Sequence, residues 1–164
     1  MKTLARIRQQ LDRIRALATT PEPQLFAARP DVSAWCAAEH LDHILKVSAA
    51  IVGRVREANP PPEKRGISFL GRVILACGWI PRGRGRSPAR LVGTRCAGSD
   101  LTASLAKLEI SIARVEPEMV ALRSPTVPHP MFGGLTPSQA LRFVFIHNAH
   151  HLKIVDEILG VRRA

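Results

Sequence analysis

The chain has 164 residues, of which 46% are hydrophobic, enough for one domain with a single apolar core over residues 1–164. No apolar run reaches the roughly 20 residues of a membrane span, and charges throughout the N-terminal segment argue against a secretory signal, so we expect a soluble, cytoplasmic protein with no membrane partner. Three cysteines without C-x-x-C spacing favour reduced thiols, and 24 basic against 13 acidic residues give a net charge of +11.

The N-terminal part predicts two amphipathic helices. Over residues 3–18 an apolar side chain recurs every three or four positions, with arginines between. Residues 19–30 contain three prolines and predict a loop. A second long helix is expected from an N-cap at Ser33 to about residue 58, before a run of prolines. His40 and His43 both lie beside its apolar stripe, and either can point inward.

Residues 63–98 are the least regular part of the chain. Residues 67–80 are apolar enough for a short buried helix or a strand, and the Gly-, Pro- and Arg-rich residues that follow predict a long crossover loop. From Glu63 to Arg95, eight basic residues stand against one acidic residue. Such a patch suits nucleic-acid phosphates, an anionic substrate or plain solvation of a surface, and the residues alone leave these three interpretations open.

A third long helix is predicted after the crossover. Ser99 or Asp100 can cap its start, and apolar residues then repeat at four-three-four-three spacing as far as the proline at position 117. Residues 124–135 are rich in proline and glycine, so they predict a loop, which contains His129.

The last predicted helix, residues 136–159, carries histidine on the face that packs inward. Thr136 is expected as its N-cap, and Gln139 can complete a capping box. His147 and His151 are four positions apart, so their Cβ atoms lie about 5–6 Å apart and their side chains can bind one cation. The alternative is two packed core histidines. The metal interpretation needs a third ligand, which either histidine of the second helix can supply.

Four amphipathic helices joined by one long crossover predict an all-α four-helix bundle, in which metal sites lie between facing helices. Two motifs resemble a known family: WCAAEHLDH at residues 35–43, and HPMFGGLT at residues 129–136 followed by HNAHH at residues 147–151. With these motifs the chain resembles the DinB-like and YfiT-like family of metal-dependent four-helix bundles over residues 33–158.

The resemblance implies an up-down-down-up bundle in which His43, His147 and His151 bind a divalent metal ion. It favours His43 over His40 because His43 follows Trp35 by eight positions. Three histidine ligands leave a coordination position for water, as in catalytic rather than structural zinc sites. Zinc or nickel is the expected ion. The family includes thiol S-transferases, which implies a low-molecular-weight thiol as a further cofactor.

The other polar candidates are expected to have structural roles. His150 points about 100° away from the metal-binding face of its helix. His129 lies in a loop stiffened by prolines, and Cys36 is a small residue near a helix start. Glu39 and Glu109 are expected at exposed helix positions.

We therefore expect a metal-dependent enzyme of the hydrolase or thiol S-transferase type, working as a homodimer on a small anionic molecule that arginines of residues 82–95 bind. Two alternatives stay open: a basic nucleic-acid-binding module, and a non-catalytic dimerising bundle with a vestigial metal site. The chain has no tyrosine, two tryptophans and five phenylalanines, so few aromatic rings are available for base stacking. We do not expect nucleic acid as a partner.

Overall fold

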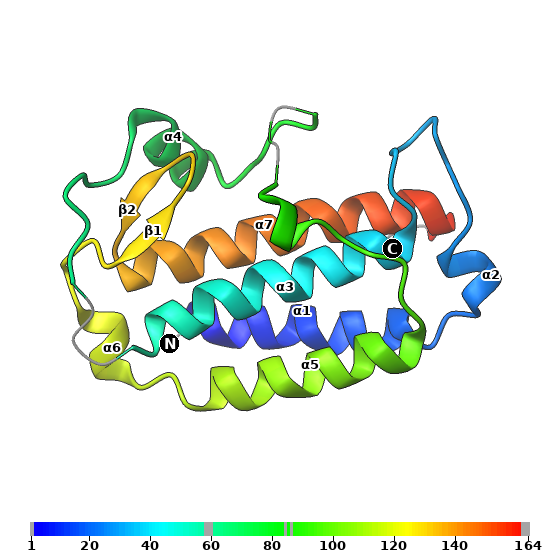
Figure 1. The fold of residues 1–164 in the computed structure, drawn as a ribbon, viewed down its shortest axis with the longest axis horizontal. Coiled ribbons are helices and arrows are strands. Elements are labelled where there is room, and N and C mark those ends of the chain that lie inside the picture. Colours follow the sequence, from blue (N-terminus) through cyan, green and yellow to red (C-terminus); the bar gives the residue numbers. More distant parts are fainter. Residues whose placement is uncertain (1, 58–60, 84, 86, 162–164) are drawn as a thin grey trace.

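The computed structural model describes residues 2–57, 61–83, 85 and 87–161. Four long helices form a bundle (Figure 1), namely α1 (Lys2–Ala18), α3 (Ala37–Val55), α5 (Gly98–Ala113) and α7 (Pro137–Leu159). In Figure 1, α1 and α7 run in one direction and α3 and α5 in the other, and the long crossover joins α3 to α5. Both α1 and α3 pack against α5 and α7. The all-α bundle with its crossover is therefore confirmed, and so is the up-down-down-up order.

The apolar stripes of the helices form the core. On α5, side chains at the predicted spacing are at most 1% exposed, and the same holds for the stripe of α1 up to Ile14. Polar residues enter the core between α3 and α7, where Ser48 Oγ donates a hydrogen bond of 3.1 Å to Asn148 Oδ1. Among the described residues, no helix combines the length and hydropathy needed to cross a membrane.

The helix ends match the sequence prediction at α7 and differ from it at α3. At α7, Thr136 Oγ1 accepts the Gln139 N–H, and Gln139 Oε1 accepts the Thr136 N–H, which is the predicted capping box. At α3 the N-cap is Cys36, not Ser33, because Glu39 Oε2 accepts the Cys36 N–H and closes a capping box there. α3 ends at Val55, and the predicted end at residue 58 lies outside the described residues.

The start of α5 also differs from the prediction. Its N-cap is Ala97 and its first residue is Gly98, so Ser99 and Asp100 lie inside the first turn. The physical reason is a close approach of backbones: a Cβ on Gly98 would overlap the carbonyl oxygen of Ala18, at the end of α1. Glycine lets the start of α5 pack directly against that end.

Two short helices lie where no helix was predicted. α2 (Glu22–Leu25) interrupts the predicted loop of residues 19–30, and α6 (Pro117–Ala121) follows α5 after a break. Each has a proline in its first turn, where the fixed φ angle suits a helix and no N–H donor is needed. At both positions the sequence analysis used proline only as a sign that the preceding helix ends. In the structure, each proline also lies at the start of a new short helix.

The crossover contains α4 (Phe69–Cys77) and a single 3₁₀ turn, η1 (Ala89–Leu91). The expected short helix is present, but the expectation that it is buried is wrong, because Phe69 is 83% exposed. Only one face of α4 is covered, with Gly71, Ile74 and Leu75 buried. A Cβ on Gly71 would lie 2.9 Å from Phe132 Cβ, so the absence of a side chain lets α4 lie close to residue 132.

A small hairpin lies in the segment predicted as loop before α7. β1 (Val127–His129) pairs antiparallel with β2 (Gly133–Leu135). Gly133 has a φ of 74°, which allows the turn into β2 without steric strain. Figure 1 shows the hairpin beside α4, above the start of α7.

Candidate metal centre

Three histidines from two helices meet inside the bundle. His43 on α3 and His147 and His151 on α7 each offer a ring nitrogen, and these atoms all lie within 4.8 Å of one another. The Nε2 atoms of His43 and His147 are 3.1 Å apart. We call these three residues the histidine triad. The set expected from the sequence is thus brought together by the packing of α3 on α7.

The spacing and chemistry of the triad fit a divalent cation. A tetrahedral zinc ion with Zn–N bonds of about 2.0–2.1 Å holds two ligand atoms about 3.3 Å apart, close to the 3.1 Å between the Nε2 atoms of His43 and His147. Zinc, nickel and related ions prefer neutral imidazole nitrogen. The donor set therefore suits a metal ion that keeps a position open for a further ligand.

Burial keeps the triad neutral at pH 7. Desolvation lowers the pKa of His43. Desolvation, and then the positive charge that His43 would carry, set the pKa of His147 well below its usual value. For His151 desolvation again comes first, followed by the nearby His147, and its pKa is strongly lowered. Each neutral imidazole has one lone pair, so the binding of a cation does not require the triad to release protons to the solvent.

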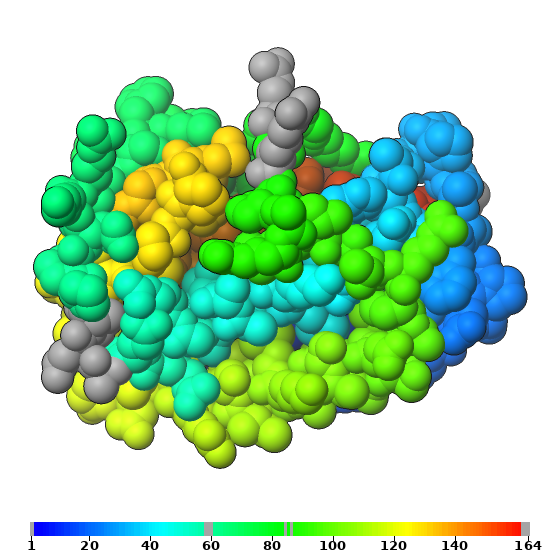
Figure 2. All heavy atoms as spheres, in the orientation of Figure 1, coloured from blue at the N-terminus to red at the C-terminus, as the bar shows by residue number. Residues whose placement is uncertain are grey.

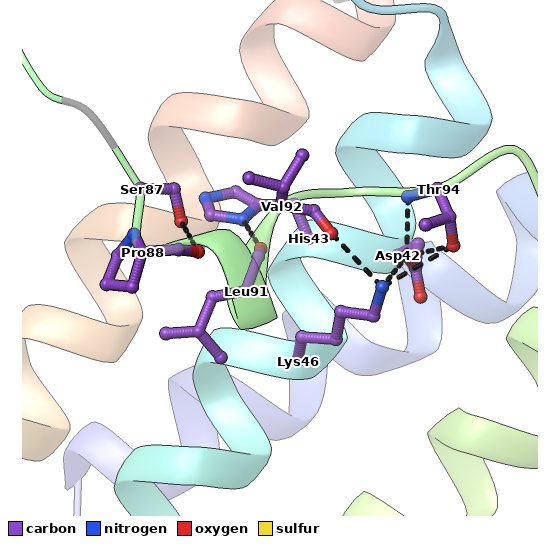
Figure 3. A network of polar contacts seen from close by, with 8 residues as sticks. All are labelled: Asp42, His43, Lys46, Ser87, Pro88, Leu91, Val92 and Thr94. Atoms are coloured by element: carbon purple, nitrogen blue, oxygen red, sulfur yellow. Dashed lines mark hydrogen bonds and ion pairs between the residues drawn. The ribbon is translucent and has the colours of Figure 1, made fainter.

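The tautomer of His43 is fixed by the crossover. Its Nδ1 lies 2.6 Å from the carbonyl oxygen of Leu91 in η1 (Figure 3). A carbonyl can only accept, so Nδ1 carries the proton and Nε2 presents its lone pair to the triad. A hydrogen bond of this kind, behind the ligand atom, is how proteins orient metal-binding histidines.

Asp42, the residue before His43, holds the crossover in place. Its carboxylate accepts hydrogen bonds from Thr94 N at 2.7 Å and Thr94 Oγ1 at 2.8 Å. It also forms an ion pair of 2.7 Å with Lys46, whose Nζ donates to the carbonyl of Val92 (Figure 3). The carbonyl that orients His43 is therefore on a segment tied to α3 by side chains of α3 itself.

Gly93 lets the crossover lie directly on α3. A Cβ at this position would overlap the carbonyl oxygen of Glu39. The sequence prediction missed Asp42, Leu91, Gly93 and Thr94 as parts of the site. For Asp42, its position next to His43 could have indicated a role in the site. The sequence around Leu91, Gly93 and Thr94 contains no such signal.

Part of His147 has no hydrogen-bond partner. Because the proton of His43 is on Nδ1, His147 Nε2 donates to His43 Nε2, and the lone pair of His147 is on Nδ1. That Nδ1 is buried and makes no hydrogen bond of normal geometry with any described residue, although a weak hydrogen bond with the neighbouring Asn148 side chain raises the pKa of this imidazole. A cation bound at His147 Nε2 would therefore require the His147 proton to move to Nδ1.

His40, the other candidate for the third ligand, lies behind the triad. Its Nδ1 is 2.9 Å from His151 Nδ1, and its Nε2 is 2.9 Å from Ser33 Oγ. Trp35 packs against it, with ring centroids 5.3 Å apart, and also against His43 at 5.1 Å. His43, not His40, is therefore the α3 residue that faces His147.

The remaining candidates have partners that explain them structurally. His129 Nδ1 accepts the N–H groups of Met131 and Phe132 and so stabilises the hairpin turn. Cys36 and Glu39 cap α3, and burial raises the pKa of the Cys36 thiol. Glu109 forms an ion pair with Arg15, and His150 makes an edge contact with His151 from outside the triad.

The triad opens into a large cavity of about 2170 Å³. Figure 2 shows atoms of α7 at the bottom of a hollow between the hairpin and the crossover. Most of its wall is apolar, including Ile74, Leu91, Phe132 and Phe143. Its described charged lining residues other than histidine are five basic side chains and one acid: Arg54, Lys64, Arg65, Arg82, Arg90 and Glu63.

Arginines of the crossover contribute unequally to this cavity. Arg82 makes two hydrogen bonds of 2.8 Å with Glu157. Arg90, in η1 next to the carbonyl that orients His43, is exposed and makes no ion pair with a described residue. Arg84 and Arg86, also part of the predicted basic loop, lie outside the described residues.

Comparison with known proteins gives one match. The family model of the DinB superfamily matches residues 6–155, which include all of α3 and α5, most of α1 and α7, and every residue of the triad. No curated protein and no solved structure matches the chain. On the extent of the family match, this chain belongs to the DinB superfamily.

Proposed function

We propose that this protein is a divalent-metal-dependent enzyme of the hydrolase or thiol S-transferase type. The observation that carries the proposal is the meeting of three neutral imidazoles at the floor of an open cavity. Zinc or nickel is the ion we expect His43, His147 and His151 to hold. Bound there, such an ion supplies Lewis acidity that activates a water molecule or a low-molecular-weight thiol.

The cavity supports a small anionic substrate with an apolar body. Phe132, Phe143 and Ile74 offer apolar surface, while among the described residues of its wall five cationic side chains stand against one acid, Glu63. Arg90 is the residue we assign to the anionic group, because it has no acidic partner among the described residues and lies beside the residue that orients His43. A planar guanidinium can bind a carboxylate through two parallel hydrogen bonds.

The test is a paired activity screen on metal-loaded and chelator-treated protein. One panel uses the 4-nitrophenyl esters of glutarate, which is anionic, and of butyrate, which is neutral. The other uses glutathione and cysteine with 1-chloro-2,4-dinitrobenzene as the electrophile. We expect metal-dependent turnover in one panel and preference for the anionic substrate. Equal rates for the loaded protein, the metal-free protein and the His151→Ala variant would overturn the proposal.

Arg90 is tested separately. In Arg90→Gln we expect KM for the anionic substrate to rise roughly tenfold, which corresponds to about 1.4 kcal/mol of lost binding. Arg72→Gln is the matched control, since Arg72 is an exposed crossover residue that does not line the cavity. An equal KM change in the two variants would contradict the role of Arg90.

The two alternative functions make different predictions. A nucleic-acid-binding module would bind DNA or RNA with steep salt dependence. A dimerising bundle with a vestigial site would hold no metal under any loading condition. The homodimer and the cytoplasmic location stay predictions from the sequence.

A further inference from the structure

We propose that Ser33 and His40 form a hydrogen-bond relay that fixes the tautomer of His151 and leaves its Nε2 free for a metal ion. This inference rests on the proposed metal site and adds two residues to it. His40 Nδ1 lies 2.9 Å from His151 Nδ1, and His40 Nε2 lies 2.9 Å from Ser33 Oγ. We call Ser33, His40 and His151 the relay.

Counting protons gives the relay two possible directions. Each neutral imidazole carries one N–H and one lone pair, so one of the two Nδ1 atoms donates and the other accepts. If His151 donates from Nδ1, its Nε2 has the lone pair, and His40 then donates from Nε2 to Ser33. If His40 donates from Nδ1, the proton of His151 is on Nε2 and blocks that ligand atom. Only the first direction is compatible with a cation in the triad.

The serine end permits the first direction. Ser33 Oγ accepts the Trp35 N–H at 3.1 Å and keeps a second lone pair, so it can also accept a hydrogen bond from His40 Nε2. With that bond in place, His40 Nδ1 is the acceptor for His151. Ser33 and Trp35 belong to the segment before α3, so this short loop is part of the site.

Packing restricts the rings of the relay and shields His40 from water. His40 is 3% exposed, so water does not compete for its nitrogens. The indole of Trp35 lies nearly parallel to the His151 ring, with an interplanar angle of 18° and centroids 6.4 Å apart. The same indole contacts the His40 ring at 5.3 Å. Both imidazoles are therefore restricted in rotation as well as in tautomer.

His40 is a positioning residue in this arrangement and not a fourth ligand. Both of its nitrogens already have partners, and neither partner is in the space between His43 and His147. Its role is parallel to that of the Leu91 carbonyl, which fixes the tautomer of His43. Two of the three triad members thus have an acceptor behind the ligand atom, one from the backbone and one from a side chain.

The test compares two substitutions of His40. In His40→Asn, Oδ1 replaces Nδ1 as an acceptor bonded to Cγ, whereas His40→Phe keeps a ring and removes the acceptor. Zinc affinity is measured by competition with a chromophoric chelator. We expect His40→Phe to lose about 10–100-fold in affinity and His40→Asn to keep most of it. His150→Phe, a neighbour outside the relay, should leave the affinity unchanged.

A second readout follows the tautomer itself. Long-range ¹H–¹⁵N correlation spectra of the metal-free protein distinguish a proton on Nδ1 from one on Nε2. We expect His151 to carry its proton on Nδ1 in the wild type and in His40→Asn, and to shift toward Nε2 in His40→Phe. Thermal unfolding of each variant shows whether a loss of zinc affinity reflects a loss of folding. For variants that are folded, the spectra show directly whether the His151 tautomer depends on His40.

The outcomes separate this inference from the proposed function. Equal affinity of His40→Phe and wild type, or the same His151 tautomer in both, would overturn the relay. A change of coordination number in the Co²⁺ spectrum of His40→Asn would also overturn it, because His40 would then be a ligand. If the wild type binds no metal while His151 keeps its Nδ1 proton, the metal function fails and the relay stands.

Discussion

The Nε2 atoms of His43 and His147 lie 3.1 Å apart although the two residues are 104 positions apart in the sequence. The proton of His43 is on Nδ1, bound to the Leu91 carbonyl, so this contact is held by the single proton of His147. On the other side of the His147 ring, Nδ1 has no hydrogen-bond partner of normal geometry in the part of the chain that the structure describes. A cation between these two Nε2 atoms would replace this hydrogen bond, with the His147 proton moved to Nδ1 so that both Nε2 lone pairs face the ion.

The first prediction concerns the pH dependence of metal binding. Burial lowers the pKa of His43, His147 and His151, so at pH 6 the triad binds fewer protons than three exposed histidines would. An exposed set of three histidines with ordinary pKa values of about 6.5 would lose roughly 30-fold in affinity from pH 7 to pH 6. We expect zinc affinity to change much less, as measured by chelator competition at both pH values. A 30-fold loss would show that the triad titrates like exposed histidine.

The second prediction concerns Gly93. In Gly93→Ala the new methyl group would overlap the carbonyl oxygen of Glu39 and push the crossover away from α3. We expect unfolding free energy to fall by about 1–3 kcal/mol and zinc affinity to fall with it, because the Leu91 carbonyl leaves His43. Urea denaturation and chelator competition measure the two effects.

Gly53→Ala is the matched control for this change. Gly53 lies on α3, and a Cβ there has no atom within 4 Å. Alanine at an open helix position should stabilise the protein by up to about 1 kcal/mol without altering zinc affinity. If both variants keep full affinity, the crossover does not orient His43.

A third prediction concerns Asp42. In Asp42→Ala, Thr94 and Lys46 lose their shared carboxylate. We expect a loss of about 2–4 kcal/mol in unfolding free energy and weaker zinc binding, since the crossover is released. Thr94→Val removes one hydroxyl bond but keeps the backbone bond to Asp42, so it should cost about 1 kcal/mol. Similar losses in the two variants would show that Asp42 does not tether the crossover.

A fourth prediction uses His129. Desolvation lowers its pKa to about 4 in the folded protein. The unfolded chain, with an ordinary pKa of about 6.5, takes up this proton first as the pH falls, so His129 destabilises the fold progressively between pH 6.5 and pH 4, by about 2–3 kcal/mol in total. Above pH 6.5 it has no such effect.

The measurement compares the wild type with His129→Asn. Asn keeps an acceptor near the N–H groups of Met131 and Phe132 but does not titrate. Unfolding free energies from pH 4 to pH 8 should show a weaker acid destabilisation in the variant and parallel curves above pH 7. Curves that stay parallel down to pH 4 would mean that His129 is accessible to protons in the folded state.

The sequence predicted those parts of the site that lie on regular helices. The spacing of His147 and His151 requires them to share a face of α7, and the capping box at Thr136 defines where that helix begins. The choice between His40 and His43 depended on the rotation of α3, which is set by its packing on α7. Only the resemblance to known bundles favoured His43 before the structure was available.

The irregular parts could not be predicted in the same way. Asp42, Leu91 and Thr94 act together because the crossover returns along α3, and no periodic pattern specifies that path. Gly93 looked like an ordinary loop glycine until its contact with Glu39 was seen. The exposure of one face of α4 was also not predicted. An apolar segment with residues such as Phe69 is normally buried, but here Phe69 is exposed.

The most direct test of the metal site is elemental analysis of protein purified without chelators or an affinity tag that binds metal. Our account predicts about one divalent ion per chain in the wild type and in His150→Ala, and strongly reduced metal in His43→Ala, His147→Ala and His151→Ala that are still folded. Wild-type protein that holds no metal after loading with zinc and with nickel, or triad variants that retain a full equivalent, would contradict the account.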